Sequence, residues 1–576
     1  MPTNPELFSL ERLDWTIYLS MIGAMVVLAM PREKKDAIRW TALLFAVSGL
    51  ALALYGLFHY QILGATPAVE RGDALTQFRR SIQFEVRYDW IPALGAVGAS
   101  YHLGADGISL PILVLNGIVA VTGVLFSWNI ENRTKEFFVL FLTLIGGVYG
   151  VFLSLDVFLL FAFYELAIIP KYFVIAIWGS TRKEYGAMKL VLYSFIGSAL
   201  VFIGVLALYF AAGGQSFDFF DTTLRNGKIV PGLLSAKLGT EFQFWCFPLI
   251  FVGFGVLAGM WPFHTWAPTG HVAAPTAASM LLAGVVMKLG AFGCLRVAML
   301  LLPEGMTAHG GFWMWTFATL AVIGIVYGAG VAWVQKDFKF VIGYSSVSHM
   351  GFVLLGLMAL NQRALEGAVL QMFSHGVIAS LLFAVVGRMV YERTHTRDLD
   401  ELSAMRLARK MPFVCATFIV GGLASMGLPG FSGFVAELNV LVGVWQSIPG
   451  IWPLQHWLAS FIPGWLPNWL QSILDSVFHF PFVMIGAGVG IVITVAYTFR
   501  AIHKAFYGDQ QFSNDATAEP ALAHDAHPLA PITWQEKLGA YILMALLVII
   551  GLYPTVLLNP ISYSVKLMLP LMTAGH

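Results

Sequence analysis

Long apolar runs separated by short polar connections make up most of this chain. A helix needs about 20 mostly apolar residues to cross a bilayer. The pattern therefore predicts an all-α polytopic membrane protein with about fourteen transmembrane helices. The runs that meet the requirement are 13–30, 40–63, 109–128, 136–153, 157–178, 187–211, 243–260, 275–302, 312–334, 340–360, 366–389, 411–445, 480–502 and 537–559.

Four longer polar stretches separate these runs, and none of them has the pattern of a soluble domain. They are 64–108, 213–242, 446–479 and 507–535. The composition of the last stretch is that of a flexible linker. The stretch 446–479 is rich in Trp and Pro, and we interpret it as an amphipathic element in the outer interface. A contact with another subunit is the alternative for this stretch.

Two predicted helices are interrupted internally. The interruptions are GMWPFHTWAPTGHVAAPT at 259–276, and Gly-Leu-Pro-Gly within GGLASMGLPGFSGFVAELNVL at 421–441. The backbone groups that a break frees must be buried in protein or line a wet cavity, because lipid cannot satisfy them. Breaks at corresponding positions predict two inverted five-helix repeats, helices 4–8 and 9–13. The expected division is 1–135 (helices 1–3 with an outer loop), 136–302 (first repeat), 303–506 (second repeat) and 507–576 (linker and helix 14).

The distribution of Lys and Arg predicts the orientation. Loops such as PREKKDAIR, STRKE, QKDFK and ERTHTRDLDELSAMRLARK carry more basic residues than the loops on the other side. Basic loops stay on the cytoplasmic side of a membrane. Both termini are therefore expected outside, in the periplasm or its equivalent.

Composition excludes several other classes of protein. The chain is 58% hydrophobic and 11% charged, against about 25% charged residues in soluble domains. Its net charge of +1 gives no bulk field that would attract nucleic acid. Cys246, Cys294 and Cys415 lie far apart in apolar runs, and His264 and His271 have no third ligand nearby. We therefore expect no metal or cluster site in this chain.

A few ionisable residues lie deep within the predicted helices. Each costs at least about 2.5–3.5 kcal/mol to place there, which makes it a functional candidate. Lys171, Lys189 and Arg296 lie nearer helix ends, where long side chains can reach the interface. The deep candidates are Glu165, Lys288, Lys339, His349, His375 and Glu437.

These candidates indicate a function when they are taken together rather than one by one. One buried Lys or Glu could be half of a structural ion pair, and one histidine is more often a satisfied core residue. Acids, bases and imidazoles on several helices, interleaved with helix breaks, predict instead a hydrated chain of proton-exchanging groups. The series favours protons over an oxygen-lined sodium site. From the residues alone, the chain is a proton or cation translocator without a redox centre of its own.

Several motifs resemble the antiporter-like membrane subunits of respiratory complex I. DVFLLFAFYELAIIPKYFVIAIWG is similar to the fifth helix of that family, and PFHTWAPTGHVAAPTAASMLLAGVVMKLGAFGCLR to its broken seventh helix and its eighth. QKDFKFVIGYSSVSHMGFVLLG, QMFSHGVIASLLFAVVGRMVYERTHTRDLDEL and GLPGFSGFVAELNVLVG extend the resemblance over most of 104–445. Within the family the chain M branch (subunit 4) is favoured. Chain L carries a long lateral helix after its core helices, whereas this sequence ends soon after the predicted helix at 537–559.

The resemblance implies a role for each candidate residue. Glu165 would be the acid of a first half-channel, and Lys288 the central lysine. His349 and His375 would be the connecting histidines, and Glu437 the terminal acid of the second half-channel. Lys339 matches a basic position in the tenth-helix motif, and His264 belongs to the seventh-helix motif and is expected on the proton path.

One departure from the family pattern concerns the seventh helix. The family usually has a lysine shortly before Pro-x-His-x-Trp, paired with the fifth-helix glutamate. Leu257 stands at that position here, and the usual Pro-Asp-Ala-His reads Pro-Thr-Gly-His. The hypothesis is that His264, Lys288 through water, or a charge on a neighbouring subunit replaces this lysine. The alternative is a first half-channel that couples weakly.

The resemblance also implies the setting of the chain. It predicts a non-redox proton-pumping subunit of an NADH:quinone oxidoreductase, in a bacterial inner membrane. NADH, FMN, iron–sulfur clusters and quinone are expected in partner subunits, with other antiporter-like subunits as neighbours and no cofactor in this chain. The alternatives are a subunit of a multi-subunit cation/proton antiporter and a ferredoxin- or hydrogenase-linked relative.

Overall fold

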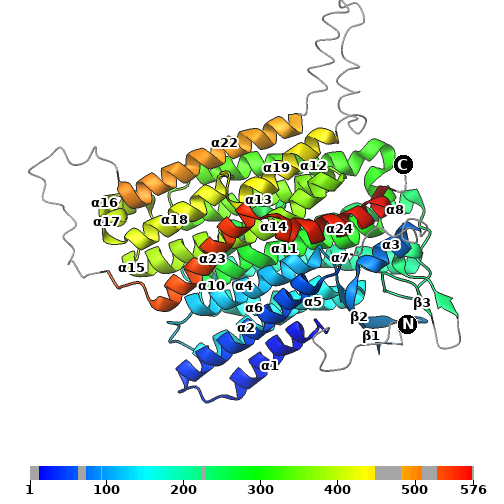
Figure 1. Cartoon of the computed structure of the whole chain (residues 1–576), viewed down its shortest axis with the longest axis horizontal. Helices are drawn as coiled ribbons and strands as arrows, with labels where there is room; N and C mark the ends of the chain where they lie inside the picture. Colours follow the sequence, from blue (N-terminus) through cyan, green and yellow to red (C-terminus); the bar gives the residue numbers. More distant parts are fainter. Residues whose placement is uncertain are drawn as a thin grey trace, which may run out of the picture.

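The helices of this protein lie side by side along one axis in a layered bundle (Figure 1). The computed structural model describes residues 12–62, 73–91, 94–223, 228–447, 482–508 and 529–573. Within these residues, twelve helices are long and apolar enough to cross a membrane. Two shorter apolar helices, α1 (Trp15–Ala29) and α18 (Pro412–Ser425), fall in two further predicted spans. The total number of crossings stays a prediction.

The remaining predicted spans coincide with described helices. Their bounds are α2 (Lys35–His59), α4 (Ser109–Phe126), α5 (Thr134–Leu153), α6 (Val157–Trp178), α7 (Lys183–Ala211), α8 (Thr240–Ala258), α12 (Pro303–Val334), α13 (Phe338–Met358), α14 (Gln362–Phe383), α19 (Ser432–Gln446), α22 (Phe482–Ile502) and α23 (Trp534–Leu552). The predicted eighth helix is a continuous run of α10 (Thr276–Leu281), the π-helical η3 (Leu282–Val286), α11 (Met287–Gly293) and the π-helical η4 (Cys294–Met299). The predicted eleventh helix continues from α14 into the π-helical η5 (Ala384–Tyr391).

Polar residues in the short connections start several of these helices. Asp156 accepts a hydrogen bond from the backbone N–H of Leu159 and caps α6. Asp337 caps α13, and Asn361 caps α14 in the same way. The first N–H groups of a helix have no intrahelical acceptor, so a side-chain oxygen at this position fixes where the helix begins.

Both predicted helix breaks are present. After α8, Gly259 adopts a positive φ of 80°, and the chain passes through η2 (Phe263–Thr265) into α9 (Trp266–Ala273). Between α18 and α19, Gly427 and Gly430 adopt positive φ values of 68° and 97°. Such backbone is easily reached only by glycine, and it interrupts the helical ladder inside the bundle. The inverted symmetry between the two halves stays a prediction.

The polar connections are more ordered than the sequence pattern indicated. Residues 64–108 contain α3 (Ala74–Ser81) and an antiparallel hairpin of β1 (Gln83–Ile91) and β2 (Ala99–Ala105), where we expected only an outer loop. A second small sheet pairs β3 (Thr222–Thr223) with β4 (Ile229–Val230), and η1 (Leu233–Ser235) follows it. The strands were missed because they lie within connections that the search for apolar runs treated only as polar loops.

Two groups of connecting segments lie at opposite ends of the bundle. The β-strands and α3 lie at one end, and α15 (Glu392–Thr394), α16 (Leu399–Met405) and α17 (Leu407–Lys410) lie at the other (Figure 1). The π-helical η6 (His503–Tyr507) packs against α16 and α17. We call the end with the strands the outer end, following the Lys/Arg distribution. Which side of a membrane it faces stays a prediction.

The C-terminal part differs from the prediction in its boundary. The predicted last helix, 537–559, is two helices, because α23 ends at Leu552 and α24 (Thr555–Thr573) follows. Gly107 packs directly against the backbone of Pro560 in α24, and its N–H donates to Ser564 Oγ at 2.9 Å. Nearly all of the predicted element at 446–479, from residue 448 on, and most of the linker at 507–535 lie outside the described residues.

A buried ion pair joins the start of α4 to η4. Arg296 donates to Asp106, and both side chains are almost fully buried. Asp106 also accepts hydrogen bonds from the backbone N–H groups of Ile108 and Ser109. The position of Arg296 near a helix end had indicated a side chain that reaches the interface. Instead, Arg296 pairs with Asp106 inside the protein.

We expect Asp106→Ala to lower the free energy of unfolding by about 3–5 kcal/mol, because the substitution leaves the Arg296 charge buried without its partner. Asp36→Ala is the matched control, since Asp36 pairs with Arg39 but has a side chain that is 81% exposed. The check is the denaturation midpoint of the detergent-solubilised protein. Equal midpoints for the two variants would contradict the prediction.

Candidate functional site

The central element of the site is a direct contact between Lys288 and His375. Lys288 lies on α11 and is fully buried, and its Nζ lies 2.7 Å from Nδ1 of His375 on α14. The Nζ also donates to the carbonyl of Ala283, in the π-helical η3. A π-turn leaves carbonyls without their usual helical partners, and here one of them accepts from the buried ammonium group.

The contact continues from His375 to Glu437. The rings of His375 and His349 lie with their centroids 5.4 Å apart. His349, on α13, places Nδ1 3.0 Å from Oε1 of Glu437 and Nε2 2.9 Å from the hydroxyl of Ser425. Four of the predicted residues, Lys288, His375, His349 and Glu437, therefore form one buried series across α11, α14, α13 and α19.

The second helix break shapes the end of this series. Glu437 lies on the first turns of α19, and a Cβ at Gly427 would lie 2.9 Å from its Oε2. Gln371 donates to Oε1 of Glu437 at 3.2 Å. The glycine at the break therefore leaves room for the carboxylate, and Ser425, at the end of α18, holds the imidazole that faces it.

Lys339, also expected on the proton path, has contacts outside the series. Its Nζ donates to the carbonyls of Ala274 at 2.6 Å and Val272 at 3.3 Å. These carbonyls belong to the end of α9, which has no following helical turn to satisfy them. A cation is favourable at a helix C-terminus, so Lys339 stabilises the end of the broken segment.

Glu165 lies apart from this series, on α6. Its side chain is partly buried, Ser198 of α7 is its hydrogen-bonding contact, and Oε1 has no hydrogen-bond partner among the described residues. His264 is buried between Tyr327 and Tyr344, with ring centroids 5.2 and 6.3 Å away. Neither ring nitrogen of His264 has a hydrogen-bond partner within the described part of the chain. The structure brings together the second-half residues, and it does not join Glu165 or His264 to them.

Two polar features were missed by the sequence analysis. Lys171 was interpreted as a lysine that reaches the interface, yet its side chain is only 2% exposed and lies inside the protein. A second group, the outer cluster, consists of Glu85, His102, Asp156 and Asp218 with their hydrogen-bond partners. Its members come from connections that the hydropathy pattern treats only as polar loops, so their proximity left no signal in that pattern.

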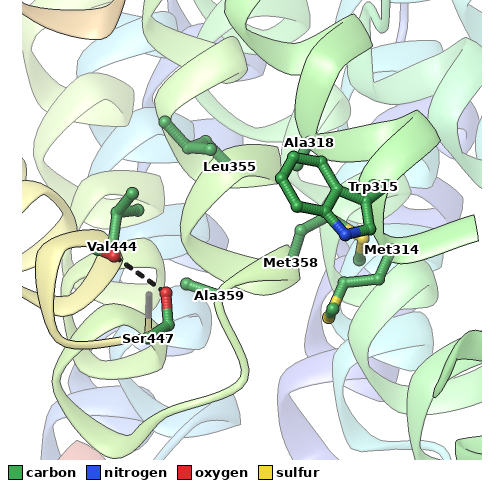
Figure 2. Close-up of a pocket in the computed structure, with 8 residues that line it drawn as sticks. All are labelled: Met314, Trp315, Ala318, Leu355, Met358, Ala359, Val444 and Ser447. Atoms are coloured by element: carbon green, nitrogen blue, oxygen red, sulfur yellow. Dashed lines mark hydrogen bonds between the residues drawn. The ribbon is translucent and has the colours of Figure 1, made fainter. Parts of the chain in front are cut away.

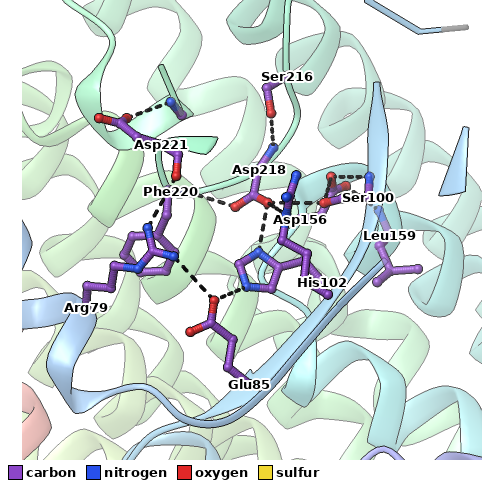
Figure 3. Close-up of polar contacts among 12 residues, drawn as sticks. Arg79, Glu85, Ser100, His102, Asp156, Leu159, Ser216, Asp218, Phe220 and Asp221 are labelled. Atoms are coloured by element: carbon purple, nitrogen blue, oxygen red, sulfur yellow. Dashed lines mark hydrogen bonds and ion pairs between the residues drawn. The ribbon is translucent and has the colours of Figure 1, made fainter. Parts of the chain in front are cut away.

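The outer cluster is held around one carboxylate (Figure 3). His102 of β2 places Nδ1 2.8 Å from Oδ2 of Asp218, and its Nε2 lies 2.8 Å from Oε1 of Glu85. Ser100 connects Asp218 to Asp156, because its hydroxyl lies 3.1 Å from a carboxylate oxygen of each. The cluster therefore ties the β1–β2 hairpin to the residue that caps α6.

Charges within the outer cluster change its titration. Burial disfavours the charged imidazole of His102, but Asp218 and Glu85 outweigh this effect and raise its pKa to about 9. Burial and the neighbouring charge of Asp218 raise the pKa of Asp156 to about 7. Arg87 and Arg79 are the other charged neighbours, at 3.2 Å from Asp218 and 3.4 Å from Glu85.

A small pocket between α12, α13 and α19 is apolar (Figure 2). Its lining has no ionisable side chain, and the hydroxyl of Ser447 donates to the carbonyl of Val444 within it. The buried series therefore does not extend into this pocket. Among the described residues no group of three His, Cys, Asp or Glu side chains could hold a metal ion.

Comparison with known sequences gives a consistent picture. A family model described as NADH:quinone oxidoreductase/Mrp antiporter, TM matches residues 154–462. The chain is 33% identical to NADH-quinone oxidoreductase subunit M of Pseudomonas aeruginosa, over 95% of each chain. It is also 33% identical to NAD(P)H-quinone oxidoreductase chain 4 1 of Synechococcus sp. (strain JA-2-3B'a(2-13)), covering 93% of this chain and 88% of the relative.

Solved structures share the fold. A chain of respiratory complex I from Thermus thermophilus superposes with a TM-score of 0.74 at 23% identity, covering 96% of this chain and 99% of the other. A chain of the Mrp complex from Dietzia sp. DQ12-45-1b superposes with a TM-score of 0.72 at 17% identity, covering 98% of each. At these identities the likeness concerns the fold.

The outer cluster predicts a pH dependence of stability. The pKa of His102 is higher in the folded protein than its ordinary value of 6.5. Its stabilising contribution is therefore fully present below about pH 6.5 and is lost as the pH rises through about 9. We expect the thermal unfolding midpoint of the purified protein to fall over this range, and to fall less steeply in His102→Gln. His59→Gln, which removes an exposed histidine, should keep the wild-type slope; the same slope in His102→Gln would overturn the assignment.

Proposed function

The chain belongs to the NADH:quinone oxidoreductase/Mrp antiporter family, and we propose that it translocates protons through its buried Lys, His and Glu side chains. The observation that carries the proposal is the series Lys288–His375–His349–Glu437, in which neighbouring groups are close enough for exchange. Amine, imidazole and carboxyl groups can each bind and release a proton. Burial makes the protonation of each group sensitive to the charge of the next.

The series gives the proton a defined course in the second half of the protein. A proton on Lys288 can pass to the Nδ1 of His375, and a proton on His349 can pass to Glu437. The step between the two histidines spans ring centroids 5.4 Å apart, which suits one ring movement or one intervening water. Ser425 and Gln371 orient the groups at the Glu437 end without taking part in acid–base chemistry.

We propose that the parent assembly is a complex I-type NADH:quinone oxidoreductase. The relatives named subunit M and chain 4 support this assignment. In such an assembly, electron transfer in partner subunits would drive the change of charge here, and NADH, FMN, iron–sulfur clusters and quinone would bind those partners. The chain would lie in a bacterial inner membrane with both termini outside.

A cation/proton antiporter is the second candidate function. The description of the matching family names the Mrp antiporter beside NADH:quinone oxidoreductase, and a chain of an Mrp complex shares the fold. Purification of the intact complex separates the candidates. A co-purifying flavin-bearing NADH-oxidising subunit supports the complex I assignment, and antiporter-like membrane subunits alone support the antiporter.

Replacement of one histidine tests the proton path. His349→Gln retains hydrogen-bonding capacity toward Ser425 and Glu437 but cannot exchange a proton near neutral pH. A positioned proton-transfer group contributes about 10²–10⁴-fold in rate, so we expect proton translocation by the reconstituted complex to fall at least about a hundredfold. The measurement is quenching of a pH-sensitive dye in proteoliposomes.

The matched control is His309→Gln, which removes a half-exposed histidine paired with Glu241. It should translocate protons at the wild-type rate. Wild-type translocation by assembled His349→Gln would show that the series is not the path.

A further inference from the structure

Lys171 is a buried cation that the series Lys288–His375–His349–Glu437 does not use. It lies on α6, its side chain is almost fully enclosed, and its Nζ has no hydrogen-bond partner among the described residues. An ammonium group in such a place is costly unless a nearby charge compensates it. Lys171 can therefore be charged at this position only if an anion lies near it.

Among the described residues, Glu165 on the same helix is the carboxylate whose charge acts on Lys171. The two residues are six positions apart, which is about 9 Å along a helix axis. Side chains on a helix lean toward its N-terminus, so the long Lys171 side chain extends toward the level of Glu165. Oε1 of Glu165 in turn has no hydrogen-bond partner within the described part of the chain, and Lys171 is the cation whose charge acts on this carboxylate there.

Other cations expected near Glu165 have different contacts. The Nζ of Lys288 is held by His375 and Ala283, and His264 lies between Tyr327 and Tyr344. Leu257, on α8, is buried and apolar. It lies one helical turn after Phe254, whose ring contacts Tyr164, the residue next to Glu165.

We propose that Lys171 is the charge partner of Glu165 in proton translocation, in place of a cation at position 257. This inference rests on the proposed function. Lys171 is a positioning residue: its charge stabilises ionised Glu165, and uptake of a proton by Glu165 removes the anion that Lys171 needs. The charge state of Glu165 and that of Lys171 are then linked, which is the property required of the first half of the protein.

Substitutions at Lys171 separate charge from packing. Lys171→Met keeps an unbranched side chain of similar length but removes the charge, whereas Lys171→Arg keeps the charge in a larger side chain. If the charge of Lys171 is what matters, Lys171→Met should lower proton translocation at least about tenfold, which corresponds to a change of one unit in the pKa of Glu165. Lys171→Arg should retain most of the translocation. A packing role predicts the reverse order, and that result would overturn the proposal.

A displaced cation gives a second test. In Lys171→Met/Leu257→Lys the positive charge returns to the vicinity of Glu165 from α8, and we expect translocation to recover relative to Lys171→Met. Lys237→Met, which removes an exposed loop lysine, is the control for charge deletion. Assembly of each variant is checked by native gel, so that translocation is compared among assembled complexes. If the double variant does not assemble, the comparison of Lys171→Met with Lys171→Arg alone tests the proposal.

Glu165→Gln distinguishes the inference from the proposed function. If Glu165→Gln abolishes translocation and Lys171→Met leaves it unchanged, Lys171 is not the partner and the proposed function stands. If Glu165→Gln and His349→Gln both leave the proton-to-electron stoichiometry unchanged, the proposed function itself fails.

Discussion

The absence of water in a bilayer core is the constraint on which this structure depends. Every backbone polar group and every charge there must find a partner inside the protein. The backbone groups at the two helix breaks therefore find partners inside the protein. At the end of α9, Lys339 donates to the carbonyls of Val272 and Ala274. At the break before α19, the backbone N–H groups of Met426 and Leu428 donate to the carbonyls of Gly422 and Leu423. At the first break, the freed carbonyls and the buried charge of Lys339 thus stabilise each other.

The same constraint explains how far the sequence predicts the structure. Long apolar runs, the glycine and proline residues of the breaks, and isolated charges in hydrocarbon are strong signals in the sequence. They single out Lys288, His349, His375 and Glu437. Outside the membrane the signal is weak. His102, Asp156 and Asp218 meet only because three separate connections fold over one end of the bundle, and such long-range contacts leave no periodic pattern.

Lys171 shows a different limit. Its distance from a helix end suggested a side chain that reaches the interface, but whether a lysine does so depends on the helices that surround it. Here α5 and α7 pack against α6, and the ammonium group is enclosed. Hydropathy records how apolar a segment is, and it does not record which neighbour covers which face. The same ambiguity applied to Arg296, whose partner Asp106 is remote in sequence.

The two halves of the bundle consequently solve one problem in different ways. In the second half, hydrogen bonds at 2.7–3.0 Å join Lys288 to His375 and His349 to Glu437, so that the groups already lie in order. In the first half, Glu165 and Lys171 act on each other through space along a single helix, and both retain unused hydrogen-bonding capacity. A pair of this kind responds to water entry or to a small movement of α6, because its energy depends on the surrounding dielectric more than on bonds already made. If the protein translocates protons as proposed, the Glu165–Lys171 pair is suited to switching between charge states, and the series Lys288–His375–His349–Glu437 to carrying the proton onward.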